Sequence, residues 1–403
     1  MFFFLPIGDE PNPPGIPYVN YGLLAANVVI YVLISLPLSL TAADPQDPRV
    51  QEYVSAIGES LPPGVPASEV LQQVSAYDLV VFSYGYRITE PSLLTLFTAM
   101  FLHGGFMHLL GNMLFLWIYG DNVEHRLGPV KYLIWYLATG VAATLFYAVF
   151  AGESQLPLVG ASGAISGVLG FYFLWFPRNR VRLWFFLFPF FSQVILLRAR
   201  LVLGFYLILD NILPFLISRG LGGGGVAHGA HIGGFLAGAL VAWVAGQRAV
   251  RSRPAEYRGR SVPASEARPI GERIAAAVRE RNFEEGGRLY FELPSQATRH
   301  LLSPEDSIAL GNWLARNGHA KAALVVYQRH LRDHPAGQGA AEAHAYAGLL
   351  QLHAFREPTA AYQHLVDALD LNPRPDIEAL VRDGLKEIAG MQKLQVRGRE
   401  RKR

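Results

Sequence analysis

Four polar side chains of this 403-residue chain have the types that acyl-transfer chemistry uses, and each stands among apolar residues. Ser162 lies in GASG, His231 lies in AHIGG, and His108 and Asn112 lie in HGGFMHLLGN. A serine hydroxyl is a weak nucleophile until an adjacent base takes its proton, and histidine is the usual base near neutral pH. Ser162 and His231 are therefore the candidate nucleophile and general base.

A serine nucleophile also needs donors for the oxyanion of its tetrahedral intermediate. His108 and Asn112 are four positions apart and would share one face of a helix. The backbone N–H of Ser162, at the start of a helix, would be a third donor. Because no orienting carboxylate is evident at this depth, we expect a dyad instead of a triad.

Each of these residues has a structural alternative when it is taken alone. Ser162 stands beside Gly163 and Gly167, a small-residue pattern that lets helices approach closely. His231 also lies among glycines, and its alternative role is that of a hydrogen-bonding group between helices. A serine, a histidine and a histidine–asparagine pair at one depth are harder to explain as independent packing choices.

Long apolar runs are expected to position these side chains. The chain is 51% hydrophobic and only 17% charged, whereas soluble proteins are about 25% charged. A bilayer core about 30 Å thick requires roughly 20 apolar residues as a helix. Six stretches approach this length, at residues 21–40, 104–120, 132–150, 161–176, 201–217 and 226–245.

A further apolar stretch, 183–197, is shorter, contains Pro189 and is bracketed by Arg182 and Arg198. We expect it to be interfacial or re-entrant; the alternative is that it spans the membrane and inverts everything after it. The segment 1–20 has no basic region of the signal-peptide kind, so we expect it to remain in the mature protein.

The charges of the loops predict the orientation of the chain. Arginines follow the fourth and sixth segments, which places these loops in the cytoplasm, whereas the connection 41–95 is acidic and rich in proline. Segments two, four and six then run inward, and their polar N-terminal ends meet near the outer leaflet. Buried polar groups at such a depth indicate function. We expect an integral protein of a bacterial plasma membrane with both termini in the cytoplasm.

These motifs together resemble those of the rhomboid intramembrane serine proteases. HGGFMHLLGN is similar to the family's His-x-x-x-Asn element, GASG to its Gly-x-Ser-Gly, and AHIGG to its sixth-helix histidine. YGDNVEHRLG, which contains Glu124 and Arg126, is similar to the family's junction between helices two and three. The resemblance covers about residues 15–247.

The resemblance implies a six-helix membrane bundle that cleaves transmembrane proteins without a metal or other cofactor. It implies Ser162 as nucleophile, His231 as base, His108 and Asn112 as oxyanion donors, and Gly160 as the residue that shapes the turn into helix four. His228 also precedes a glycine, but the Ala-His-x-Gly-Gly context favours His231. A substrate helix would have to unwind locally before cleavage.

His103 matches a histidine of some relatives and is expected to be structural or to contact water. Two features fall outside this pattern. The first loop lacks the Trp-Arg pair found in part of the family. Asp210 and Asn211 lie inside the fifth segment, where a buried carboxylate is costly. They have no assigned partner; the alternatives are contact with a water cavity and a satisfied polar pair between helices.

The residues after the membrane region predict a separate helical domain. We expect a polar linker at 248–268, an α-helical domain similar to tetratricopeptide repeats at 269–395, and a basic tail at 396–403. Two segments 38 positions apart match each other, close to the repeat period of 34. The shared positions are Ala322 and Ala360, Ala323 and Ala361, and Pro335 and Pro373. Such a domain would bind a protein or peptide; the alternative is a helical bundle without a partner.

The sequence therefore predicts an active intramembrane protease, with a catalytically idle membrane adaptor as the alternative. Its partners would be transmembrane substrates and the lipid bilayer. The net charge of +3 is too small to indicate a nucleic-acid partner, and the absence of cysteine excludes disulfides.

Overall fold

The computed structural model describes residues 2–58, 71–150, 156–187, 191–221, 228–251, 254, 267–293, 295, 297, 298 and 300–400. Two compact units divide the chain: a membrane unit of Met1–Glu10 and Pro14–Ala242, and a C-terminal unit of Pro11–Pro13 and Trp243–Arg403. This division precedes the predicted boundary at residue 247. Pro189 and most of the predicted linker lie outside the described residues. The same is true of Glu59 and Glu69 in the acidic connection, of Glu153 before the GASG motif, and of Arg253 after the sixth segment.

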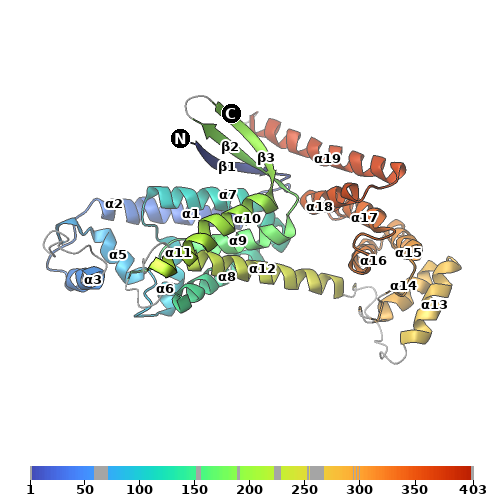
Figure 1. Cartoon of the computed structure of the whole chain (residues 1–403), viewed down its shortest axis with the longest axis horizontal. Coiled ribbons are helices and arrows are strands. Elements are labelled where there is room, and N and C mark those ends of the chain that lie inside the picture. Colours follow the sequence, from blue (N-terminus) through green and yellow to red (C-terminus); the bar gives the residue numbers. More distant parts are fainter. Residues whose placement is uncertain are drawn as a thin grey trace. The chain divides into compact units, whose positions relative to one another are not determined.

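Helices make up most of the membrane unit (Figure 1). The first run consists of α1 (Tyr18–Ile30), the π-helix η1 (Tyr31–Ser35) and α2 (Leu36–Ser39). Shorter helices follow, namely α3 (Pro48–Gly58), α5 (Ala76–Tyr84), α6 (Leu93–Thr98) and η2 (Ala99–Phe101). The remaining helices are α7 (Phe106–Leu127), α8 (Pro129–Phe150), α9 (Ser162–Trp175), α10 (Ala199–Leu207), η3 (Ile208–Ile212), α11 (Leu213–Leu221) and α12 (His228–Arg251).

Several of these helices have the length and composition of membrane spans. Four runs among the described residues qualify: Tyr18–Ser39, Pro129–Phe150, Ala199–Ile217 and His228–Ala249. A fifth candidate is α7, which follows Leu93–Phe101 after a 90° bend. The 14 residues of α9 extend about 21 Å, less than a bilayer core of about 30 Å. These helices coincide with the six predicted segments, so the helical membrane fold is confirmed, while six crossings remain a prediction.

The short helix α9 lies in the interior of the membrane unit. Ten of its 14 residues are buried, on every side of the helix. A helix that is apolar all round belongs in a core. Because protein surrounds α9, its shortness does not expose polar backbone to lipid.

A polar network centred on Glu124 joins the first helix to the bundle. The first amides of a helix lack intrahelical acceptors, and α1 has no side-chain cap of its own. The buried Glu124 carboxylate of α7 accepts from the N–H groups of Val19, at 3.1 Å, and Asn20, at 2.7 Å. The Asn20 amide accepts from the Tyr132 hydroxyl of α8 at 2.8 Å. Glu124, which belongs to the YGDNVEHRLG motif, therefore has a structural role.

Most of the stretch 183–197 belongs to a three-stranded antiparallel sheet, and its expected interfacial or re-entrant position remains a prediction. The strands are β1 (Phe2–Glu10), β2 (Arg180–Leu187) and β3 (Phe191–Arg198), in the order β1-β2-β3 (Figure 1). β2 and β3 are rich in aromatic and β-branched residues, which favour strands. β2 lies between β3 and β1 and pairs with both. β1 comes from the segment 1–20, for which the sequence predicted no secondary structure. The sheet is the exception in an otherwise helical fold.

A buried carboxylate attaches β1 to the helices. Asp9 is 2% exposed; its Oδ2 accepts from Asn122 Nδ2 of α7 at 2.9 Å and from the hydroxyl of Tyr172 on α9. The Tyr172 hydroxyl in turn accepts from Asn179 Nδ2 at 2.8 Å. Hydrogen bonds of this kind offset the cost of burying polar groups.

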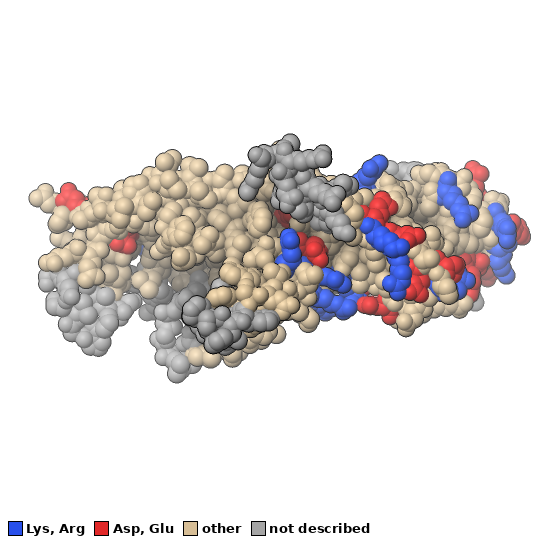
Figure 2. Space-filling view, turned by 90° about the horizontal axis from the view of Figure 1, so that it is seen from above, with Lys and Arg blue, Asp and Glu red and all other residues tan. Residues whose placement is uncertain are grey.

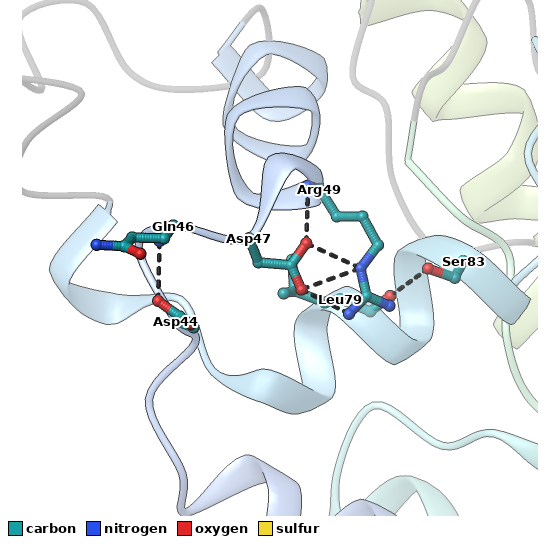
Figure 3. A network of polar contacts seen from close by, with 6 residues as sticks. All are labelled: Asp44, Gln46, Asp47, Arg49, Leu79 and Ser83. Carbon is teal, nitrogen blue, oxygen red and sulfur yellow. Dashed lines mark hydrogen bonds and ion pairs between the residues drawn. The ribbon is translucent and has the colours of Figure 1, made fainter.

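Local hydrogen bonds order part of the acidic connection between the first two predicted spans (Figure 3). Asp47 accepts from the backbone N–H and the guanidinium of Arg49 at the start of α3, and Asp44 accepts from the N–H of Gln46 at 2.9 Å. Aspartate side chains commonly close turns in this way. The connection is thus partly helical, with α3 and α5 inside it.

The C-terminal unit is helical, and its charged side chains of both signs contrast with the sparsely charged membrane unit (Figure 2). Its helices are α13 (Ala267–Arg279), α14 (Phe283–Glu292), α15 (Pro304–Arg316), α16 (Ala320–Asp333), α17 (Ala340–His353), α18 (Pro358–Asp370) and α19 (Pro375–Glu400). Ser303 caps the start of α15, because its hydroxyl accepts from the N–H of Asp306 at 3.1 Å.

The matching segments of this unit adopt equivalent positions in two helices. α16 begins at Ala320 and α18 at Pro358, which are 38 residues apart. The paired alanines are buried, at 0% exposure for Ala322, Ala323 and Ala361 and 9% for Ala360. Small residues there allow close helix packing. The arrangement is a set of helical hairpins, and its assignment to tetratricopeptide repeats remains a prediction.

The Glu124 network yields a stability prediction. Glu124→Ala leaves two amides of α1 without their charged acceptor, so we expect the free energy of unfolding of the membrane unit to fall by about 3 kcal/mol. Unfolding of the full chain in detergent micelles would measure this loss. Glu90→Ala is the control, because the Glu90 side chain, which pairs with Arg87, is 62% exposed and surface ion pairs contribute little. Equal stability of the two variants would contradict the proposed role.

Candidate active site

Ser162 is the first residue of α9 and follows a turn that requires glycine. Gly160 has φ +120°, which side chains rarely adopt, and its N–H donates to the carbonyl of Ala99 at 2.8 Å. A Cβ on Gly160 would also lie 2.8 Å from Nε2 of His108. Both the backbone conformation and the space therefore require glycine at this position.

His231 lies in the first turn of α12 and contacts Ser162 directly. The distance from His231 Nε2 to Ser162 Oγ is 2.8 Å, within hydrogen-bond range. The two residues are 69 positions apart in the chain. The predicted nucleophile and base are therefore adjacent in the folded chain.

Glycines allow the backbones of α9 and α12 to come close enough for this contact. A Cβ on Gly234 would lie 2.1 Å from the carbonyl oxygen of Gly163, and one on Gly238 would lie 2.0 Å from that of Gly167. In the other direction, a Cβ on Gly170 would lie 2.1 Å from the carbonyl oxygen of Phe235. Any side chain at these positions would force the helices apart. Close helix packing at glycines is therefore not an alternative to a functional site here, because it brings Ser162 and His231 together.

His108 faces the same region from α7, and Asn112 follows four residues later on the same face of that helix. The position that a Cβ on Gly160 would take lies 2.8 Å from the His108 ring and 3.7 Å from Ser162 Oγ, so the ring and the hydroxyl flank this glycine. Asn112 lies one turn further along α7 and is 8% exposed. Its Nδ2 has no hydrogen-bond partner among the described residues. A buried amide group without a partner is costly unless a ligand uses it.

Asn211 is the residue of the site that sequence reasoning missed. Its Oδ1 lies 2.7 Å from His231 Nδ1, on the side of the ring opposite Ser162. The sequence predicts a dyad and assigns no partner to Asp210 or Asn211. A polar residue inside an apolar segment was the available signal; only the packing of η3 against α12 identifies its partner.

The remaining histidines are placed differently from His231. The buried His103 donates its N–H to the Tyr77 hydroxyl at 3.0 Å, and its carbonyl accepts from that hydroxyl at 2.9 Å. His228 lies with its ring 6.4 Å from that of His231, and no hydrogen bond to Ser162 is found for it among the described residues. The Tyr77 hydroxyl thus fixes the backbone of residue 103, just before α7.

The arrangement has the parts needed for acyl transfer. A hydroxyl contacts a histidine nitrogen, as nucleophilic catalysis requires. Ser162 is also at a helix N-terminus, where N–H groups lack intrahelical acceptors, and Asn112 has a buried donor nearby in α7. Among the described residues, no group of three or more His, Asp or Glu side chains is arranged to bind a metal.

The part of the chain that contains the candidate site is similar to a known protein family. Residues 90–248 match a family model described as Rhomboid domain, and these residues include every side chain of the candidate site. The match begins before α6 and ends within α12.

Curated relatives carry the same family name. Rhomboid protein 1, mitochondrial, of Saccharomyces cerevisiae is 29% identical over 156 residues, which are 38% of this chain and 42% of the yeast protein. Rhomboid protease GluP of Bacillus subtilis is 44% identical over 75 residues, 19% of this chain and 14% of the relative. RHOMBOID-like protein 1 of Arabidopsis thaliana is 35% identical over 107 residues, 26% and 25% of the two chains. The chain spans less than half the length of each relative.

The glycine contacts between α9 and α12 yield a second prediction. Gly238→Ala places a methyl group against the carbonyl of Gly167 and displaces α12, which carries His231. A displacement of about 1 Å costs about 10²-fold in reactivity. The rate at which a fluorophosphonate labels Ser162 would measure it. Gly246→Ala is the matched control on α12, since no atom lies within 4 Å of its Cβ position; equal rates for the two variants would refute the explanation.

Proposed function

Because the chain belongs to the rhomboid family through residues 90–248, we propose that this integral membrane protein is a serine endopeptidase that cleaves other membrane proteins within the bilayer. The observation that carries the proposal is the 2.8 Å contact between Ser162 Oγ and His231 Nε2. Family membership alone would also fit a catalytically idle member. The contact favours the active form, because an unused serine and histidine would have no reason to be held in this geometry.

The proposed reaction follows from the order of these contacts. His231 Nε2 accepts the hydroxyl proton while Ser162 Oγ attacks the carbonyl carbon of the substrate peptide. The protonated imidazole then gives this proton to the leaving amine as the C–N bond breaks. Water, activated by the same nitrogen, hydrolyses the acyl-enzyme and regenerates the serine.

The charge that develops on the carbonyl oxygen needs donors. His108, the amide Nδ2 of Asn112 and the backbone N–H of Ser162 are the proposed set. Buried donors fixed before the reaction act strongly, because they need no reorganisation in a site of low dielectric constant. The missing partner of Asn112 Nδ2 supports its assignment.

The substrate class follows from the location of the site. Ser162 begins a helix in the interior of the membrane unit, so the scissile bond must approach through the membrane domain. A helical substrate has no accessible carbonyl of extended backbone, so we propose transmembrane segments that unwind locally. We also propose a bacterial plasma membrane, with both termini in the cytoplasm as the arginine-rich loops indicate.

Cleavage of single-span membrane proteins by the purified chain in liposomes tests this function. We expect cleavage by the wild type, none by Ser162→Ala or His231→Ala, and a reduction of about 10²- to 10³-fold for Asn112→Ala, the usual cost of one oxyanion donor. Ser166→Ala, one turn further along α9, is the matched control and should retain activity.

Two results would count against the proposal. Undiminished cleavage by Ser162→Ala would exclude the mechanism. Failure of the wild type to cleave a broad substrate panel, together with no reaction of Ser162 with a fluorophosphonate, would favour the idle adaptor.

A further inference from the structure

Three side chains form a continuous hydrogen-bonded chain through the candidate site. Ser162 Oγ lies 2.8 Å from His231 Nε2, and His231 Nδ1 lies 2.7 Å from Asn211 Oδ1. The residues come from α9, α12 and η3 respectively. Both ring nitrogens of His231 therefore have a defined partner.

The orientation of the Asn211 amide determines which atom faces the ring. Asn211 Nδ2 donates to the carbonyl oxygen of Tyr206 at 3.0 Å. A carbonyl only accepts, so the Asn211 NH₂ group must point to Tyr206 and its Oδ1 must point to His231. An amide oxygen can only accept as well. The proton of the neutral imidazole must then sit on Nδ1, which leaves Nε2 unprotonated and able to accept the proton of Ser162.

An irregular turn of the helix positions Asn211. Ile208–Ile212 form a π-helix, in which the N–H of the following Leu213 donates to the carbonyl of Ile208. A π-turn contains one residue more than an α-turn and rotates the residues after it relative to the preceding helix; such turns are frequent at functional sites. Asn211 is 1% exposed, whereas its neighbour Asp210 is exposed. The turn thus places an amide, and not the adjacent carboxylate, against the histidine.

We propose that Asn211 is a positioning residue that holds His231 in the tautomer and orientation required of the general base. This role rests on the proposed function and adds a third member to the predicted dyad. A neutral amide suits a membrane interior, because a carboxylate there would carry a large desolvation cost whenever the imidazole is uncharged. The amide fixes the proton on Nδ1 without burying a second charge.

Other titratable groups bear on the pH dependence of this hydrogen-bonded chain. His228 on α12 and His108 on α7 act on His231, whereas Tyr206 on α10 and Asp210 on η3 lie beside Asn211. Of these, Asp210 is the nearest neighbour of Asn211 in sequence. Changing Asp210 is therefore the proper control for the effect of a local alteration in η3.

The pH dependence of fluorophosphonate labelling of the full chain in detergent tests the proposal without a known substrate. For Asn211→Leu we expect labelling to slow by about 10²-fold or more, the size of a general-base contribution, with its acidic limb displaced to lower pH, because the imidazolium loses an acceptor. For Asn211→Asp we expect substantial labelling with the acidic limb displaced to higher pH, because a carboxylate stabilises the imidazolium. Asp210→Leu should label at nearly the wild-type rate.

Each other outcome has a definite meaning. Wild-type rates and pH profile in Asn211→Leu, or slowing without displacement of the pH profile in both Asn211 variants, would overturn the positioning role. If Asn211→Leu fails to fold, as judged by gel filtration, the displacement in Asn211→Asp decides. Absence of labelling in the wild type would overturn the proposed function itself, and this role with it.

Discussion

The candidate site depends on the close approach of the backbones of α9 and α12. The carbonyl oxygens of Gly163 and Gly167 on α9 lie so close to Gly234 and Gly238 on α12 that neither of these two glycines has room for a Cβ. This approach brings the first residue of α9 within hydrogen-bond distance of the first turn of α12. If the helices separated by the width of a methyl group, Ser162 and His231 would still be present but would no longer form a pair.

A second constraint is the need of buried polar groups for internal partners. In an apolar surrounding, an amide or carboxylate cannot turn to water, so the chain supplies a partner from another helix. Glu124 caps the amides of α1, and Asp9 attaches the sheet to α7 and α9. These networks fix the bundle around α9, while Asn112 Nδ2 is left without a partner among the described residues. That contrast distinguishes structural polar groups from one available to a ligand.

Much of this arrangement could be predicted from the sequence because its signals are local. Apolar length predicted the positions of the membrane helices, and the buried alanines of α16 and α18 followed from a repeat. The motifs around Ser162, His231, His108 and Asn112 predicted the membership of the candidate site. Even the glycines were recognised as helix-packing residues, although their part in the site was not.

What the sequence alone determined was thus which residues could react and which segments could cross a membrane, since residue type and apolar run length carry that information directly. The tertiary structure decided the partners. A π-turn places Asn211 against His231, a contact that its polar type alone does not reveal. Within the apolar stretch, β2 pairs with the first residues of the chain and with β3. Both depend on contacts between distant segments, whose energies no local pattern records.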